Sequence, residues 1–360
     1  MPNVPEEIEG ISLGFSLSIG LVFVVALFLF QTCRPHIRNF PPGPHGLPVL
    51  GNALDLRKDP WLKLTSWKET YGPIVYFHVL GRPVVVLNTL DVAVELLDRR
   101  AVSTSARPPW IIANKLSGGQ FLPFIDSQTH LWRRIRKIYH EGFRPANRHY
   151  LESALYQEAS VFCARALTQP PTQGSDIYSY LQHYVSSASL SMIYGHSSSV
   201  GVSIDPVSVT LDHSIRRILN SLVDFHLVEI FPWLDCIPSR FAPWKRNAQQ
   251  IFFSDSAIIR DLLESRRSSK DNRRQDAIVD TMITSIDKGT LSETDGSWGA
   301  FALYVGMQTA AGVLSWALLA LILHPDIQRR AHAELHQVVG RERPPTFDDF
   351  DDLPYIQALV

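Results

Sequence analysis

Trp132 and Arg136 stand four residues apart in the run Trp-Arg-Arg-Ile-Arg. On a helix this spacing puts both side chains on one face. An indole N–H and a guanidinium can only donate hydrogen bonds, so side by side they can hold a carboxylate group. The spacing alone is weak evidence, because a surface arginine beside a core tryptophan produces the same pattern.

A second set of candidate residues lies in the long apolar stretch 301–325. This stretch is apolar nearly all round, which predicts a central buried helix, with a second membrane span as the alternative. Gln308, Thr309 and small neighbours in its middle argue against a span, as does the amphipathic pattern that follows at 325–339. Gly306 would let a flat group approach the helix backbone closely.

The composition excludes several classes of protein. The chain has 360 residues, of which 45% are hydrophobic, and a net charge of −1. These values indicate a globular core and no nucleic-acid partner. Basic pairs such as Arg266-Arg267 are interpreted as solvated helix faces. The wide spacing of the cysteines fits neither a zinc site nor a disulfide framework, so no metal ligand is assigned to Cys33, Cys163 or Cys236.

Residues 11–30 form an uncharged apolar run long enough to cross the hydrocarbon core of a bilayer, about 30 Å. Acidic residues precede the run and basic residues follow it, which places the rest of the chain in the cytosol. A cleaved signal peptide would have a shorter apolar region with positive charge before it. The pattern therefore predicts an uncleaved single-pass anchor in membrane lipid.

The remaining organisation follows from local patterns. Residues 1–10 would be a short luminal N-terminus, 31–52 a basic and proline-rich hinge, and 53–360 the cytosolic body. In the body, a helix is predicted from Pro60, then a hairpin from 74–79 and 83–87, and then mostly helices. Residues 265–275 are predicted to be a charged loop. The expected fold is mainly α with a small β-sheet portion.

Taken together, these motifs resemble those of the cytochrome P450 family, in its fungal and microsomal form. The resemblance rests on the proline-rich hinge, the order helix–hairpin–helix, the Trp-x-x-x-Arg helix and the apolar stretch 301–325. It implies a P450 fold and a haem cofactor. By matching positions, it implies that a haem propionate is bound by Trp132 and Arg136 and that the haem face is lined by Val305 and Gly306. It further implies that Thr309 steers protons to bound dioxygen, with Gln308 at the neighbouring catalytic position.

Two of these positions depart from the family pattern. Gln308 stands where the family has an acid, and an amide can hydrogen-bond but cannot exchange a proton as a carboxyl does. Val305 is bulkier than the usual alanine or glycine. Separately, the apolar and proline-rich segment 231–238 resembles the loop between the F and G helices, which lies near the bilayer in membrane-bound members.

The resemblance implies a haem-thiolate monooxygenase that inserts oxygen into an apolar small molecule. Electrons would come from NADPH–cytochrome P450 reductase at the endoplasmic reticulum. The sequence ends at Val360, soon after the K-helix pattern at 353–358 and before the Glu-x-x-Arg and haem-cysteine motifs. We therefore expect an incomplete domain that lacks its proximal cysteine ligand and is inactive. The alternatives are a non-catalytic membrane-anchored interaction module and an incomplete gene model.

Overall fold

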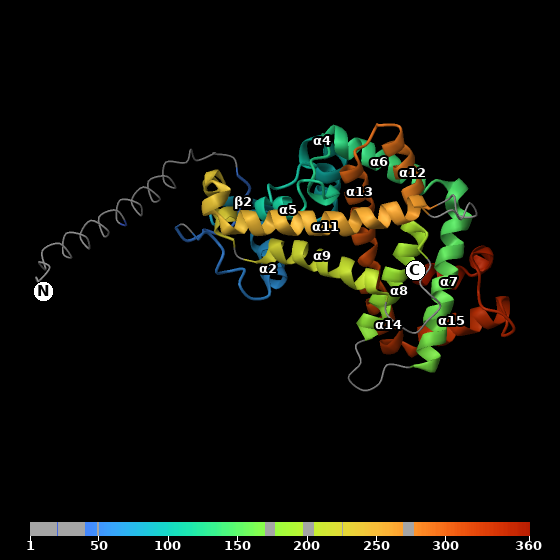
Figure 1. Ribbon diagram of the computed structural model, residues 1–360. Helices are drawn as coiled ribbons and strands as arrows, with labels where there is room; N and C mark the ends of the chain where they lie inside the picture. The colour runs from blue at the N-terminus through green and yellow to red at the C-terminus, as the bar shows by residue number, and fades with distance from the viewer. Residues whose placement is uncertain are drawn as a thin grey trace, which may run out of the picture. The chain divides into compact units, whose positions relative to one another are not determined.

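The computed structural model describes residues 20, 40–48, 50–169, 177–196, 205–224, 226–268 and 277–360 (Figure 1). The anchor expected at 11–30 lies outside these residues apart from Gly20, as does the N-terminal part of the hinge. The described residues divide into two compact units, one that ends at Ser105 and one that begins at Ala106. Each unit is described by itself below.

The first unit contains the only β-sheet among the described residues. Helix α2 (Pro60–Tyr71) is followed by the antiparallel strands β1 (Ile74–Val79) and β2 (Arg82–Leu87). The turn between the strands, Leu80-Gly81, has positive φ at both residues, as tight hairpin turns require. The predicted helix and hairpin are therefore confirmed. After them come α3 (Leu90–Ala93), the π-helical η1 (Val94–Arg99) and α4 (Ala101–Thr104).

The described part of the proline-rich hinge lies along the free edge of β1. The backbone N–H of Tyr76 donates to the carbonyl oxygen of Pro42 at 3.0 Å, and that of Asn52 donates to His78 at 2.8 Å. A Cβ at Gly43 would collide with the carbonyl group of Tyr76, so only glycine allows this approach. The hinge therefore pairs with the sheet as an irregular third segment.

All regular elements described in the second unit are helical. In chain order they are α5 (Ile111–Leu116), η2 (Leu122–Phe124), α6 (His130–Gly142), η3 (Pro145–Asn147), α7 (Arg148–Thr168), α8 (Ile177–Tyr194), α9 (Pro206–Val223), α10 (Leu227–Ile230), η4 (Pro232–Cys236), η5 (Ser239–Phe241), α11 (Pro243–Ser268), α12 (Ile278–Asp287), α13 (Glu293–Gln308), α14 (Ala310–Leu323), α15 (Pro325–Val338), η6 (Phe347–Asp352) and α16 (Pro354–Leu359). Together with the hairpin, they confirm the expected fold, mainly α with a small sheet.

Helix α13 is the central element of the second unit. Its side chains Trp298, Phe301 and Tyr304 are completely buried. The rings of Trp298 and Phe301 pack edge to face with their centroids 5.6 Å apart, and the Trp298 indole donates to Ser256 on α11 at 2.9 Å. The buried indole thus keeps its one hydrogen bond while its ring fills the core.

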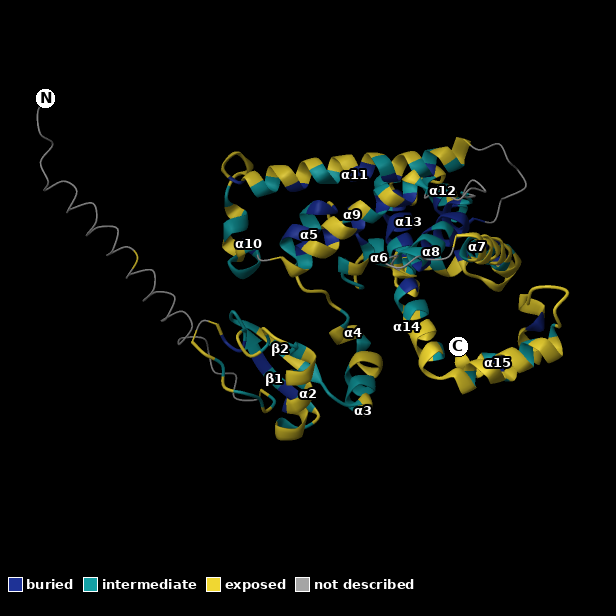
Figure 2. Cartoon of the chain, turned by 90° about the horizontal axis from the view of Figure 1, so that it is seen from below, coloured by how far each residue is buried: buried dark blue, intermediate teal, exposed yellow. Residues whose placement is uncertain are grey.

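The long apolar stretch does not form one uniformly buried helix. A break at Thr309 separates α13 from α14, and α14 is largely exposed, with Trp316 at 72% (Figure 2). The expected burial therefore holds for α13 and is wrong for most of α14. Helix α14 packs on α8 and α15 among the described elements. The run Glu293–Leu323 is the one described helical segment long and apolar enough to cross a membrane, with a mean hydropathy of 1.7.

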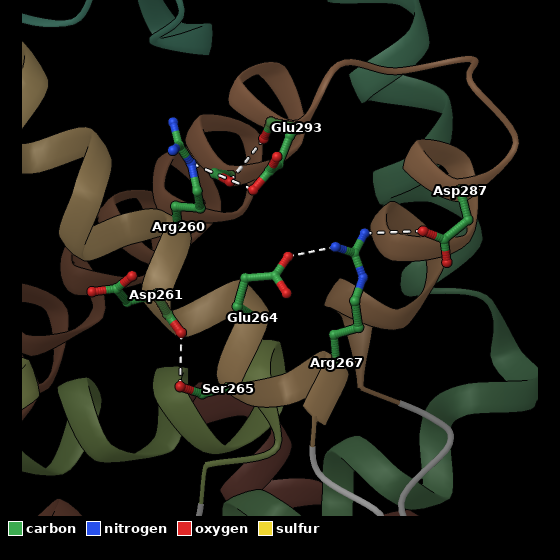
Figure 3. A network of polar contacts seen from close by, with 8 residues as sticks. Arg260, Asp261, Glu264, Ser265, Arg267, Asp287 and Glu293 are labelled. Atoms are coloured by element: carbon green, nitrogen blue, oxygen red, sulfur yellow. Dashed lines mark hydrogen bonds and ion pairs between the residues drawn. The ribbon is translucent and has the colours of Figure 1, made fainter.

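Charged side chains join α11 to α12 and α13 near their ends. Arg267 pairs with Glu264 and with Asp287, the latter at 2.9 Å, and Arg260 pairs with Glu293 at 3.4 Å (Figure 3). Helix α11 continues to Ser268, so the first residues of the predicted loop 265–275 are helical.

Arg266 does not belong to a solvated face, as its sequence context had indicated. Its side chain is only 9% exposed, and two of its nitrogens donate to the Asp280 carboxylate at 2.8 and 2.7 Å. This bidentate geometry explains why a charged side chain is tolerated there, because burial of a charge requires a partner that satisfies it.

Candidate functional site

Helix α6 is fixed against α13 through Gly299. The Thr129 hydroxyl caps α6 by accepting from the backbone N–H of Trp132 at 3.2 Å. Ile135 is fully buried, and its Cδ1 lies 3.5 Å from where a Cβ on Gly299 would stand. The Tyr139 hydroxyl donates to the Gly299 carbonyl at 2.6 Å, and burial raises the pKa of Tyr139. Both Ile135 and Tyr139 therefore hold α6 at the same point of α13.

Trp132 and Arg136 flank this contact on α6. Trp132 is half-buried and Arg136 is exposed. Within the described part of the chain, no hydrogen bond or ion pair engages the indole N–H of Trp132 or the guanidinium of Arg136. The two side chains therefore remain available as donors to an anionic group.

A mainly apolar cavity of about 470 Å³ lies between α7, α8 and the junction of α13 with α14. Gly306 and Thr309 both line it. A Cβ at Gly306 would meet no atom within 4 Å, so the glycine leaves open space against the helix backbone. The Thr309 hydroxyl donates to the carbonyl of Gly306 at 2.9 Å, at the break between the two helices. The α13 backbone at Gly306 is therefore open to the cavity, and the Thr309 hydroxyl lies beside it.

The structure brings together only some of the residues that the sequence singled out. Gly306 and Thr309 share the cavity, whereas Val305 packs against the main hydrophobic core. Trp132 and Arg136 are not among the residues that line the cavity. Their link to it is indirect: α6 packs on Gly299, which lies seven residues, or about two turns, before Gly306 on nearly the same face of α13.

Gln308 points toward α8. Its Oε1 accepts a hydrogen bond from the Ser186 hydroxyl at 2.9 Å, and its Nε2 is buried without a hydrogen-bond partner among the described residues. The side chain does not line the cavity that Thr309 lines. Gln308 is therefore anchored to α8 next to Thr309 through its carbonyl oxygen, and its amide NH2 group is left unused.

Sequence reasoning missed the polar groups that continue from Gln308. Ser186 lies near Tyr304, where its hydroxyl lowers the pKa of the phenol, and the Tyr304 hydroxyl lies 3.4 Å from Asp212 Oδ1 on α9. Gln182 donates to the other carboxylate oxygen at 3.2 Å. The spacing of Gln182 and Ser186, and of Tyr304 and Gln308, is four residues in both cases, which was the available sign of two facing polar stripes.

Neither described cysteine lies at these positions. Cys163 is on α7 and Cys236 ends η4, and both are exposed. The described ranges contain no group of three or more His, Cys, Asp or Glu side chains that could hold a metal ion.

The unpaired donors on α6 suit an anionic group, and the open helix backbone at Gly306, beside Thr309, suits a flat one. Together they fit the class of helical proteins that bind a flat, anionic cofactor. The chain belongs to the cytochrome P450 family, whose family model, "Cytochrome P450", matches residues 41–360. Haem is the cofactor of this family, so the fold and the cofactor class follow from membership.

Several of the similar proteins are fungal. A cytochrome P450 monooxygenase of Armillaria gallica is 37% identical over 94% of this chain and 64% of its own length. The cytochrome P450 monooxygenase iboC of Amanita muscaria is 32% identical over 95% of this chain and 60% of its own length. Cytochrome P450 monooxygenase 58 of Postia placenta is 32% identical over 96% and 64% respectively. The chain thus spans less than two thirds of the length of these relatives.

Proposed function

We propose that these residues form one wall of the haem site of a haem-thiolate monooxygenase that inserts one oxygen atom into an apolar small molecule. The observation that carries the proposal is the open position at Gly306 in the wall of a mainly apolar cavity of about 470 Å³, beside the Thr309 hydroxyl. Membership of the P450 family and the monooxygenase names of the relatives support it.

The residues present fit such a cofactor. Haem, when bound, supplies the redox chemistry that activates dioxygen. The free donors of Trp132 and Arg136 would bind its propionates, and Gly306 would let the ring approach the α13 backbone. Thr309 would present its hydroxyl at the helix break, where it can hold a proton near bound dioxygen. Gln308 would hold its amide beside Thr309 without transferring a proton, since an amide does not exchange protons as a carboxyl does.

The proposal assigns the thiolate ligand of the iron to a cysteine outside these 360 residues, so that the chain by itself is inactive. Cys163 and Cys236 are exposed, and the relatives extend over a greater length. Membranes that carry the 360-residue chain, reduced and treated with carbon monoxide, should lack the red-shifted thiolate band. A chain extended through a haem-cysteine loop should show it. A thiolate band from the 360-residue chain would assign the ligand to Cys163 or Cys236 and contradict this part.

The open position at Gly306 is tested by filling it. In the extended chain, Gly306→Val should lower the haem bound per polypeptide, because the added side chain occupies the space against the ring. Gly312→Val is the matched control: its Cβ also meets no atom within 4 Å, yet Gly312 does not line the cavity. Equal haem content in the two variants would contradict the proposed site.

We further propose that residues 11–30 anchor the protein in the endoplasmic reticulum membrane, with the body in the cytosol and NADPH–cytochrome P450 reductase as electron donor. The motive is the uncharged run with acidic residues before it and basic residues after it. Carbonate extraction and protease digestion of intact microsomes test this. The chain should stay with the membrane and its body should be digested; a protected body would reverse the orientation.

A non-catalytic interaction module is the second candidate function. The exposed apolar face of α14, where Trp316 and Ile322 are each 72% exposed, favours it. The proteolytic half-life of the 360-residue chain, compared with the extended chain in the same membranes, separates the two candidates. A shorter half-life for the 360-residue chain supports the monooxygenase proposal, and equal half-lives support the module.

A further inference from the structure

Two pairs of polar side chains face each other between α8 and α13. Gln182 and Ser186 are one turn apart on α8, and Tyr304 and Gln308 are one turn apart on α13. Ser186 donates to Gln308 at 2.9 Å and lies near enough to Tyr304 to lower the pKa of its phenol. The two stripes therefore meet at the Ser186 hydroxyl.

The stripes converge on one carboxyl group, that of Asp212 on α9. Its Oδ1 lies 3.4 Å from the Tyr304 hydroxyl, which is long for such a hydrogen bond, and its Oδ2 accepts from Gln182 at 3.2 Å. A series of neighbouring polar side chains thus runs from Asp212 through Tyr304 and Ser186 to Gln308, next to Thr309. Gln308 itself has no acid function, so Asp212 is the ionisable end of this series.

Several groups act on Asp212 and on its neighbour Tyr304. From its own helix, Arg216 and His213 favour the ionised carboxylate, as does the hydrogen bond from Tyr304, while burial disfavours it more strongly and raises the pKa of Asp212. Burial and the negative charges of Asp212 and Asp205 keep Tyr304 a neutral phenol. The carboxyl is therefore the ionisable group of the series, and its pKa lies above the ordinary value of an aspartic acid.

We propose that Asp212 is a positioning residue for Gln308: its protonation state is transmitted through Tyr304 and Ser186 and determines how firmly the Gln308 amide is held beside Thr309. The catalytic consequence rests on the proposed monooxygenase function. The hydrogen-bond coupling itself concerns only α8, α9 and α13, and can be measured without cofactor.

The direction of the coupling follows from the donors available. When Asp212 is ionised, Tyr304 gives its one O–H to the carboxylate and Ser186 receives no donor from it. When Asp212 is neutral, the Tyr304 O–H is released and can donate to Ser186. A hydroxyl that accepts a hydrogen bond becomes a better donor, so the bond from Ser186 to Gln308 strengthens. Acidification should therefore hold Gln308 more tightly.

The test follows the side-chain amide resonance of Gln308 during a pH titration of the 360-residue chain with ¹⁵N-labelled glutamine, in detergent and without cofactor. Gln308→Asn identifies the resonance by its loss. In the unsubstituted chain, the resonance should move with pH, with a midpoint above the ordinary pKa of an aspartic acid. In Asp212→Asn this movement should be lost.

Two further variants distinguish transmission from a direct effect of the charge. Tyr304→Phe and Ser186→Ala both keep Asp212 titratable but interrupt the series, so the Gln308 movement should be lost in both. Asp224→Asn is the matched control, an exposed acid just beyond the C-terminal end of the same helix, and it should retain the movement. A resonance that is insensitive to pH in the unsubstituted chain, or that still titrates in Tyr304→Phe, overturns the proposal.

The consequence for turnover is measured in the haem-loaded extended chain. The ratio of product formed to NADPH consumed should depend on pH in the unsubstituted enzyme, and this dependence should be lost in Asp212→Asn and kept in Asp224→Asn. An extended chain that binds no haem would refute the proposed function while the resonance titration still decides the coupling. If the ratio of product formed to NADPH consumed in Asp212→Asn keeps the pH profile of the unsubstituted enzyme, the catalytic part of the proposal is overturned.

Discussion

The Tyr139 hydroxyl donates a 2.6 Å hydrogen bond to the backbone carbonyl of Gly299 in the middle of α13. The helix that carries Trp132 and Arg136 is thereby tied to the helix that carries Gly306. At Gly299 the two helices are close enough for a tyrosine to reach a carbonyl group already inside a helix. This contact sets the relation between the two halves of the candidate site.

Removing this hydroxyl should weaken the fold without changing its shape. We expect Tyr139→Phe to lower the free energy of unfolding by about 1 kcal/mol, because one buried hydrogen bond is lost while the ring remains. Urea denaturation of the detergent-solubilised chain is the measurement. Tyr156→Phe, at an exposed position on α7, should change the value by less than about 0.5 kcal/mol. Equal effects in the two variants would show that the hydroxyl of Tyr139 is not stabilising.

Two glycines should respond in opposite ways to alanine. A Cβ at Gly142 would lie 2.7 Å from Cγ2 of the fully buried Ile278, so Gly142→Ala should cost about 1–3 kcal/mol through overpacking. At Gly306 the added methyl meets no atom within 4 Å, and alanine favours the helix by up to about 1 kcal/mol. Thermal unfolding of both variants decides this. A destabilised Gly306→Ala would mean that the space is already filled.

Adjacent arginines on α11 should differ sharply in their effect on stability. Arg266→Gln breaks the bidentate pair with Asp280, in which the arginine is 9% exposed, and should cost about 1–3 kcal/mol because the carboxylate keeps only the backbone N–H of Ala277. Arg267→Gln removes pairs in which the arginine is 33% exposed, and should cost at most about 1 kcal/mol. Chemical denaturation compares them. Similar losses would indicate that the Arg266 pair is effectively solvated.

The segment around η6 should lose an interaction in acid. Hydrogen bonds from Arg343, at 2.7 and 2.5 Å, and from the Thr346 backbone hold the pKa of Asp349 well below its ordinary range. Because the folded-state pKa is depressed, the resulting stabilisation is complete above the ordinary pKa of an aspartic acid. It is lost as the pH falls through the folded-state value.

A titration of the Asp349 carboxyl by ¹³C NMR measures this effect. Arg343→Gln should raise the Asp349 pKa toward its ordinary value, because the largest contribution is the hydrogen bond from Arg343. Arg341→Gln, which removes an exposed neighbouring charge that pairs with His336, should leave the titration of Asp349 in place. An unchanged midpoint in Arg343→Gln would contradict the assignment.

Much of the fold could be predicted from local patterns. Proline at the start of α2, alternating apolar residues in the hairpin and the amphipathic run of α6 all depend on neighbours within a few residues. Such patterns act before any distant contact forms, which is why the predicted elements appear close to their expected bounds. They do not report what lies opposite a side chain, and the interpretation of Arg266 as solvated was wrong for that reason.

By itself, the sequence determined the family, the helical class and the residue types at Trp132, Arg136, Gly306 and Thr309, because each depends on identity and spacing along one segment. Only the tertiary structure decided where Gln308 points. Its partner Ser186 is 122 residues away in the chain, and the carboxyl group beyond it belongs to a third helix. Contacts of this kind arise when separate helices pack. The spacing of side chains along one helix contains no information about its register against another helix.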